Sequence, residues 1–127
     1  MFRLGLKRVF EARHFLIGGD WGRENAEHAH RYSLEWVLAG PALDGHGFLA
    51  DIVQLNETLD SVLDGYRGRL LNSLPGFEGL NSSLERFVRL LAEGLSAGAD
   101  RPGLVTETVR LGESESAWAE WEPGEAG

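Results

Sequence analysis

Three of the four histidines in this chain have a spacing that suits a metal site. His28 and His30 are two residues apart, and side chains two apart on a strand point to the same face, so both imidazoles can reach one ion. His14 lies just after another predicted strand, and pairing of the two strands would bring it to the same ion. Three neutral imidazoles without a fourth protein ligand are the usual composition of a catalytic zinc site, in which water or substrate takes the open position.

The same spacing fits a plainer interpretation, in which the histidines are solvated or hydrogen-bonded at the strand ends. A His-x-His pair alone leaves both interpretations open. The remaining histidine, His46, lies in the turn 44–47 and is expected to be exposed to solvent.

Two predicted strands would position these histidines. Residues 2–10 largely alternate between apolar and polar side chains, which is typical of a half-buried strand. Residues 18–27 are a polar, glycine-rich loop, and residues 28–39 form the second strand. The apolar residues that share one face of this second strand are Tyr32, Leu34, Trp36 and Leu38.

A first helix is predicted from residue 52 onward. Asp51 is its expected N-cap, because apolar residues recur at intervals of three to four positions directly after it. Gly65 and Gly68 are expected to end the helix, and residues 72–80 form a loop.

A second helix is predicted to begin near Ser82 or Ser83. Ser82 and Glu85 have the spacing of a capping box, in which the two side chains satisfy backbone N–H groups of the first turn. Gly98 and Pro102 are expected to close this helix. Its apolar stripe consists of Leu84, Phe87, Val88, Leu91 and Leu95.

The chain ends in a predicted hairpin of two strands, residues 104–111 and 117–121, before a frayed acidic tail. The resulting order β-β-α-α-β-β predicts a single α+β domain over residues 1–127, with an antiparallel sheet and both helices on one face. Such a sheet has two open edges, and open edges invite pairing between subunits, so we expect a homo-oligomer.

The overall composition narrows the function classes. The formal net charge of −8 argues against a nucleic-acid backbone or an anionic membrane surface as the partner. The chain has no cysteine, which excludes disulfides, thiolate ligands and a cysteine nucleophile. No apolar run approaches the roughly 20 residues that span a bilayer, and residues 1–10 do not read as a signal peptide, so a cytoplasmic location is expected.

Several short motifs, taken together and in order, resemble the 6-pyruvoyl-tetrahydropterin synthase family, which includes the 6-carboxytetrahydropterin synthases. They lie at residues 12–15, 27–32, 47–51, 81–85 and 113–119, so the resemblance spans essentially the whole chain. It implies the tunnelling fold, or T-fold, which has the same element order. In that family three subunits pool their sheets into a barrel, and two trimers stack as a homohexamer.

The resemblance also implies roles for individual residues. His14, His28 and His30 fall on the family's Zn²⁺ ligands, with Ala29 in place of the usual middle glycine. Glu113 falls on the glutamate that anchors the pterin, a role that suits a carboxylate because it can accept two parallel hydrogen bonds from the amino group and a ring N–H. Without the resemblance, Glu113 would be taken for a solvated turn residue.

Two departures from the family pattern concern catalysis. The family's catalytic cysteine is replaced by Glu24, and Glu27 is a second carboxylate close to His28. Either could relay a proton if it lies within hydrogen-bond reach and partly out of water, although Glu24 could equally be a mobile loop residue. The family's Asp-His pair after the first helix is replaced by Arg67 and Gly68.

The sequence therefore favours a zinc-dependent, lyase-type pterin enzyme that acts on 7,8-dihydroneopterin triphosphate or a related pterin. Glu24 or Glu27 would transfer protons and Glu113 would hold the pterin. The alternative is a zinc-binding T-fold homologue without the standard synthase activity, which binds a pterin or purine-like ligand or runs different chemistry.

Overall fold

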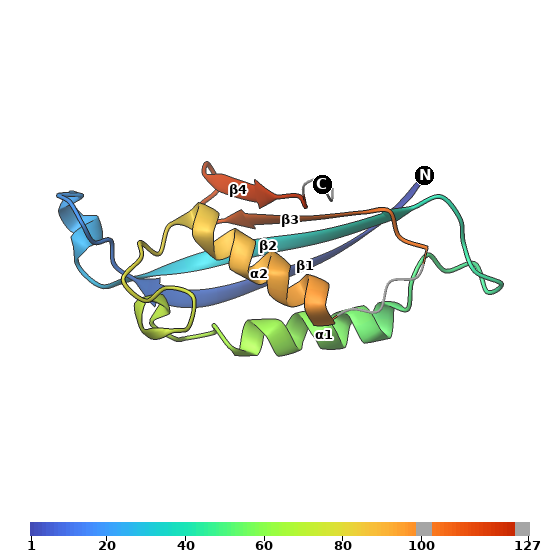
Figure 1. Ribbon diagram of the computed structural model, residues 1–127, viewed down its shortest axis with the longest axis horizontal. Helices are drawn as coiled ribbons and strands as arrows, with labels where there is room; N and C mark the ends of the chain where they lie inside the picture. The colour runs from blue at the N-terminus through green and yellow to red at the C-terminus, as the bar shows by residue number, and fades with distance from the viewer. Residues whose placement is uncertain (99–102, 124–127) are drawn as a thin grey trace.

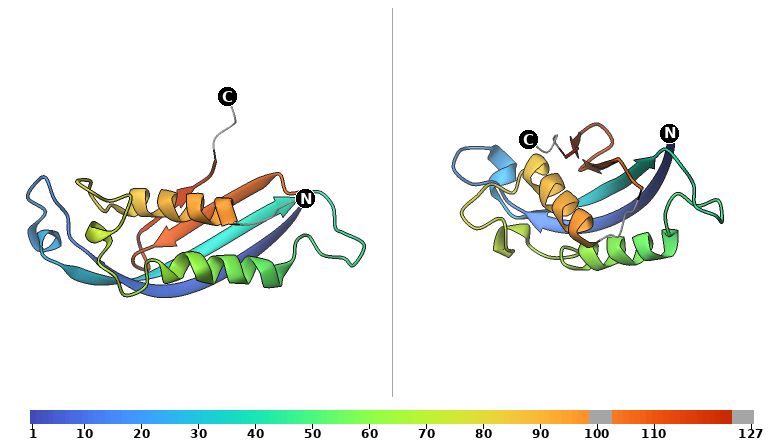
Figure 2. Two further views of the ribbon diagram at one scale, coloured as in Figure 1. Left: turned by 60° about the horizontal axis from the view of Figure 1, so that its bottom comes forward. Right: turned by 45° about the vertical axis from the view of Figure 1, so that its right-hand side comes forward.

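The computed structural model describes residues 1–98 and 103–123 of the chain. Its four strands form one antiparallel sheet in the order β1-β2-β3-β4, as Figure 1 shows. The strands are β1 (Phe2–His14), β2 (His28–Gly40), β3 (Thr106–Gly112) and β4 (Trp118–Trp121). Two helices, α1 (Ile52–Asp64) and α2 (Leu84–Gly98), cover one face of the sheet (Figure 2). The predicted α+β fold and element order are thus confirmed.

The first strand, β1, extends four residues beyond its predicted end at residue 10. Alternate residues Phe10, Ala12 and His14 all remain buried, so the half-buried pattern continues to the end of β1. β1 and β2 pair along their whole length, from Phe2 opposite Gly40 to His14 opposite His28. His14 is therefore the last residue of β1, not a residue beyond it, and the pairing register places it directly beside the His-x-His pair.

The hydrophobic core lies between the sheet and the two helices. The four alternating residues of β2 predicted to share one face are all buried there. Near the histidines this core is aromatic, with Phe10 stacked on Tyr32 and both rings in contact with Phe87 of α2. This packing anchors the ends of β1 and β2 against α2, which gives the histidines a rigid base.

One helix cap agrees with the prediction and one does not. The Asp51 carboxylate accepts hydrogen bonds from the backbone N–H groups of Val53 and Gln54 at 3.0 and 3.3 Å, as expected for the N-cap of α1. At α2 the predicted capping box is wrong. The Ser83 hydroxyl accepts the Arg86 N–H at 3.2 Å, whereas the Ser82 hydroxyl donates to the Phe15 carbonyl of another segment.

The remaining boundaries differ from prediction by small shifts. α1 ends at Asp64, close to both predicted glycines, and α2 ends at the predicted Gly98, while Pro102 lies outside the described residues. A short 3-10 helix, η1 (Gly22–Asn25), lies within the predicted loop 18–27, and a second, η2 (Leu71–Ser73), overlaps the start of the predicted loop 72–80. β3 begins two residues and ends one residue later than expected, and β4 begins one residue later, so the turn between them covers residues 113–117.

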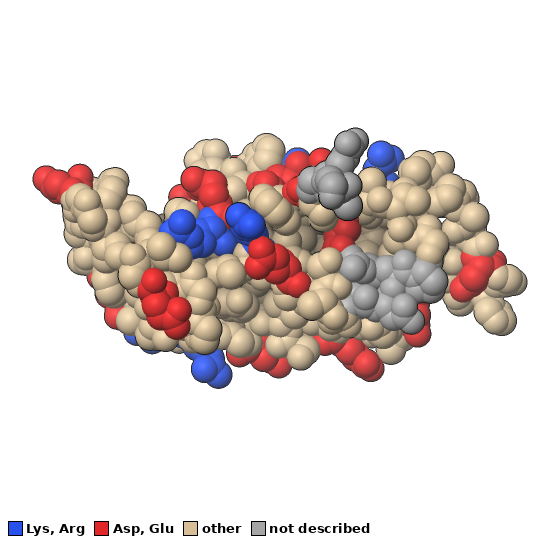
Figure 3. Space-filling model, viewed as in Figure 1, with Lys and Arg blue, Asp and Glu red and all other residues tan. Residues whose placement is uncertain are grey.

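The surface charge agrees with the acidic composition. On the face shown in Figure 3, acidic side chains are widely spread, whereas the basic ones there gather mainly in one small group over the first half of α2. Among the described residues, no helix is both long enough and apolar enough to cross a bilayer.

Candidate metal centre

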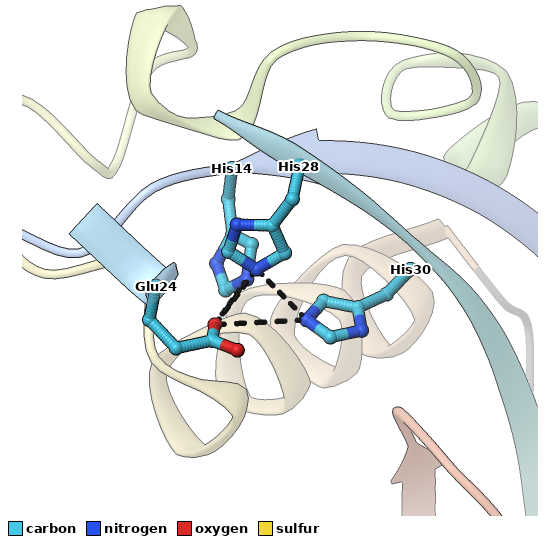
Figure 4. Close-up of side chains that lie close together, drawn as sticks. All are labelled: His14, Glu24, His28 and His30. Carbon is cyan, nitrogen blue, oxygen red and sulfur yellow. Dashed lines mark hydrogen bonds and ion pairs between the residues drawn. The ribbon is translucent and has the colours of Figure 1, made fainter. Parts of the chain in front are cut away.

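The three predicted histidine ligands converge at one end of the sheet (Figure 4). His14 ends β1 while His28 and His30 begin β2, and the antiparallel register brings all three to the sheet face that α2 covers. Their ring centroids lie 4.5 to 5.0 Å apart. The Nε2 atoms of His28 and His30 are only 3.1 Å apart. The structure thus brings the predicted cluster together.

The hydrogen bonds of two of these rings orient their free nitrogens inward. His14 Nδ1 lies 2.9 Å from the carbonyl oxygen of Ser82, and His28 Nδ1 lies 2.7 Å from that of Ala26. A carbonyl oxygen only accepts, so each Nδ1–H donates, and in the neutral form of either ring the lone pair is then on Nε2. Backbone carbonyls commonly orient metal-binding imidazoles in this way.

Of the three predicted ligands, His14 has the environment that bears most directly on metal binding. It is only 3% exposed, and its Nε2 is a buried nitrogen without a hydrogen-bond partner. Burial lowers the pKa of His14 and outweighs the opposing effect of the bond to the Ser82 carbonyl. The ring is therefore neutral near pH 7, which is the form that binds a metal. An orphaned, buried, neutral Nε2 that faces two other imidazoles fits a divalent metal ion.

Glu24 joins the histidines as a fourth potential donor. Its Oε2 lies 2.7 Å from Nε2 of His28, 3.9 Å from that of His14 and 4.0 Å from that of His30. One donor atom from each of the four residues lies within 4.8 Å of the others. The cluster therefore has a carboxylate that the three-histidine prediction did not include among the ligands.

The loop that carries Glu24 is folded back on itself. The Leu16 N–H donates to the Glu24 carbonyl at 2.7 Å. The amide of Asn25 accepts from the Trp21 N–H and donates to the carbonyls of Leu16 and Gly19. These bonds define the position of Glu24, which argues against the alternative of a freely mobile loop residue.

Glu27, the other predicted base, lies outside the cluster. Its carboxylate pairs with Arg13 Nη1 at 2.8 Å. Arg13 precedes the buried His14, so its side chain points to the opposite face of the sheet. Glu27 is paired with Arg13 on that face, whereas Glu24 lies at the histidines on the other face. The two candidate bases are therefore separated.

A cleft connects the histidines to the predicted pterin anchor. Its volume is about 620 Å³, and its lining includes His14, Glu24, Ser83, Glu113 and Trp118. Glu113 stands at the turn between β3 and β4, where its N–H donates to the Ala117 carbonyl at 3.1 Å. Glu113 and the metal-cluster residues are thus neighbours across one cleft, although they are far apart in sequence.

The buried Tyr32, whose ring contacts that of His30, is influenced by both carboxylates of this cleft. Burial raises the pKa of Tyr32, and the nearby negative charges of Glu113 and Glu24 raise it further. Its hydroxyl therefore stays protonated through the neutral range.

The replacements for the family's Asp-His pair lie away from the cluster. Arg67 pairs with Asp64 and Asp60 of α1, at 3.0 and 3.7 Å. The Gly68 N–H donates to the Glu11 carbonyl at the edge of β1. His46 is exposed in its turn, as predicted, and contacts only the ring of Phe48 among aromatic neighbours.

Sequence reasoning missed the residues that position His14. The Asn72 side chain accepts from the Phe15 N–H and donates to the Phe15 carbonyl, at 3.0 and 2.9 Å. Asn81 does the same to Ile17, at 3.0 and 3.1 Å. Each side-chain amide thus bonds both backbone groups of one residue after β1, as a paired strand would. No periodic pattern marks such residues, although Asn81 lies in one of the motifs that resemble the family.

Comparison with known proteins decides the family. A family model described as 6-pyruvoyl tetrahydropterin synthase matches residues 3–124. This chain belongs to that family. No curated protein sequence matches it.

Solved structures of 6-pyruvoyl tetrahydropterin synthases share the fold. The Caenorhabditis elegans synthase matches with a TM-score of 0.83 at 22% identity, covering 98% of both chains. A Plasmodium vivax synthase in which a catalytic glutamate is replaced by alanine matches with a TM-score of 0.77 at 17% identity, covering 96% of this chain and 97% of that one. At such identities these matches establish the T-fold and leave the activity to be argued from the site.

Proposed function

We propose that this protein is a zinc-dependent lyase of the 6-pyruvoyl tetrahydropterin synthase family, acting on 7,8-dihydroneopterin triphosphate or a closely related pterin. The single observation that carries the proposal is the convergence of three histidine Nε2 atoms and the Glu24 carboxylate beside a cleft that also contains Glu113. Metal ligands, a proton acceptor and a pterin anchor thereby surround one space.

The residues of the site would have separate roles in binding the metal ion and the substrate. Bound by His14, His28 and His30, zinc would polarise side-chain hydroxyls of the substrate and stabilise negative charge on their oxygens. Glu113 would accept two parallel hydrogen bonds from the amino group and a ring N–H of the pterin, which fixes the orientation of the ring.

Glu24 is the better candidate for the proton acceptor. Its carboxylate lies at the metal cluster and lines the cleft, whereas Glu27 is paired with Arg13 on the opposite face. A base must reach its proton within hydrogen-bond distance, so of these two carboxylates it is Glu24 that meets the geometric requirement. The catalytic glutamate of the Plasmodium vivax relative supports a carboxylate in this role.

A homologue without standard synthase activity is the second candidate. Two observations favour it: the chain has no cysteine, and Arg67 and Gly68, which replace the Asp-His pair, lie away from the histidines. Such a protein would keep the zinc and the Glu113 anchor and bind a pterin or purine-like ligand, or run different chemistry.

Turnover of 7,8-dihydroneopterin triphosphate by the zinc-loaded protein separates the two candidates. We expect release of triphosphate or of a side-chain fragment, measured by chromatography and mass spectrometry. Glu24→Gln should lower kcat by at least about 100-fold, in line with the loss of a general base. Glu27→Gln is the matched control and should retain full activity. Zinc-loaded wild-type protein without turnover would instead favour the second candidate.

We also propose that the protein assembles as a homohexamer of two stacked trimers. β1 and β4 are the two edges of the sheet. Within residues 1–98 and 103–123, segment 68–70 pairs with the free edge of β1 only at its His14 end, so most of this long edge is open for pairing with a neighbouring subunit.

A further inference from the structure

We propose that Glu24 is a fourth metal ligand in the substrate-free protein and that a substrate opens the site by displacing its carboxylate. The inference rests on the metal centre of the proposed function. It changes the expected resting state, because a site built from His14, His28 and His30 alone would be open to water.

The distances between the four donor atoms match a shared ion. Tetrahedral zinc with bonds of roughly 2.0–2.2 Å to nitrogen and oxygen places neighbouring donor atoms about 3.4 Å apart. The separations from Glu24 Oε2 to the three Nε2 atoms are 2.7, 3.9 and 4.0 Å, and that between His28 and His30 is 3.1 Å. These values lie on both sides of the tetrahedral separation, so small side-chain adjustments suffice.

The contacts within the cluster call for a positive charge at its centre. His28 gives its Nδ1 proton to the Ala26 carbonyl, so a neutral ring has only a lone pair on Nε2. That lone pair faces a carboxylate oxygen at 2.7 Å and the Nε2 of His30 at 3.1 Å. A proton on one Nε2 would satisfy a single contact, whereas a metal ion shared by these atoms satisfies all of them and also gives the buried Nε2 of His14 a partner.

Glu24 is the carboxylate that the fold supplies for this role. The folded loop closed by Asn25 brings it to the histidines. Its side chain is 46% exposed and lines the cleft together with His14. Glu24 is thus the most exposed of the four donor residues, and a ligand in the cleft lies beside this carboxylate.

Displacement would place the carboxylate where the reaction needs it. Once a substrate oxygen takes its position, Glu24 remains tethered by its loop at the edge of the cleft, within reach of the bound ligand. One residue would then keep the site closed before binding and supply the proton acceptor afterwards.

Metal affinity provides the first test. The dissociation constants of wild-type protein, Glu24→Ala and Glu27→Gln for Co²⁺ and Zn²⁺ are measured by competition with a chromophoric chelator. Loss of a ligand should weaken binding by Glu24→Ala at least about tenfold, since even outer partners of a metal site contribute 10–100-fold. Glu27→Gln removes a neighbouring carboxylate outside the cluster and should stay within about twofold of wild type.

Access to the fourth position provides the second test. Imidazole is titrated into each Co²⁺-loaded protein and followed by visible absorption. Glu24→Ala should bind imidazole at least about tenfold more tightly than wild type, because water is displaced more easily than a tethered carboxylate. Imidazole is neutral, so loss of the glutamate charge does not account for the gain.

The outcomes separate this inference from the proposed function. If wild-type protein takes up metal and Glu24→Ala matches it in both measurements, Glu24 is not a ligand and the inference fails, while the zinc site stands. If wild-type protein takes up no metal, the metal centre itself fails, and the proposed function fails with it.

Discussion

At the scale of single residues, the site depends on which ring nitrogen of His14 and of His28 is not hydrogen-bonded to the backbone. The carbonyls of Ser82 and Ala26 occupy Nδ1 of His14 and His28, so both rings offer Nε2 to the cluster. These backbone partners lie in loops that no strand or helix pattern indicates. The metal-binding form of the histidines is therefore a product of the loops as much as of the strands.

Replacement of one ligand should remove the metal. Purified wild-type protein, prepared without chelator, is expected to contain about one zinc per chain, and His28→Ala should contain close to none because two imidazoles are too few. Elemental analysis by mass spectrometry measures both. His46→Ala is the control, since this histidine is exposed and lies outside the cluster. Equal zinc contents in all three proteins would contradict the site.

At the scale of elements, side chains extend the sheet beyond its last backbone pair. β1 ends at His14, yet Asn72 and Asn81 continue its hydrogen bonding at Phe15 and Ile17. The Ser82 hydroxyl also donates to the Phe15 carbonyl at 3.2 Å. These bonds keep the chain after His14 close to the start of α2, where the cleft opens.

Loss of the Asn72 side chain should affect stability and metal binding together. Asn72→Ala leaves the Phe15 N–H without its partner, which costs about 1–3 kcal/mol of unfolding free energy, and it should weaken zinc affinity by about 10–100-fold. Urea denaturation and chelator competition measure the two effects. Ser73→Ala removes an adjacent, exposed hydroxyl and should change the unfolding free energy by less than about 0.5 kcal/mol. If Asn72→Ala behaved like this control, Asn72 would not support the site.

At the scale of the whole molecule, one long sheet edge remains to be covered. The N–H of Arg13 and the carbonyl of Glu11 point away from β2, toward segment 68–70. Alternation along an antiparallel strand then directs the backbone groups of Val9 outward as well. Its exposed fraction of 51% agrees with an unfilled position on the outer face.

A proline at this edge should separate the subunits without unfolding them. Val9→Pro removes an outward N–H that β2 does not use, so the sheet of one chain is kept while pairing across the edge is blocked. Light scattering should give six times the 14.0 kDa chain mass for wild type and a smaller assembly for the variant. Val9→Thr keeps the N–H and should assemble normally. A hexameric Val9→Pro protein would show that β1 is not the pairing edge.

The element order, the buried face of β2 and the three histidines were all predictable from the sequence. Their signals are local patterns in the sequence: alternation every two residues, recurrence every three to four residues, and the His-x-His spacing. Each can be recognised without knowing which residues are in contact. The ends of elements were less predictable. β1 extends four residues beyond its predicted end, and Ser83 caps α2 in place of the predicted Ser82. Tertiary partners decide both of these features.

Only the tertiary structure distinguished between the two carboxylates near the histidines. Glu24 and Glu27 are both close to His28 in sequence, and either could have been the base. Strand alternation sends Glu27 to Arg13 on the outer face, whereas the loop closed by Asn25 folds Glu24 inward. Sequence spacing identifies which donors are available, but their convergence on one point depends on long-range pairing and loop hydrogen bonds, which have no periodic signature in the chain.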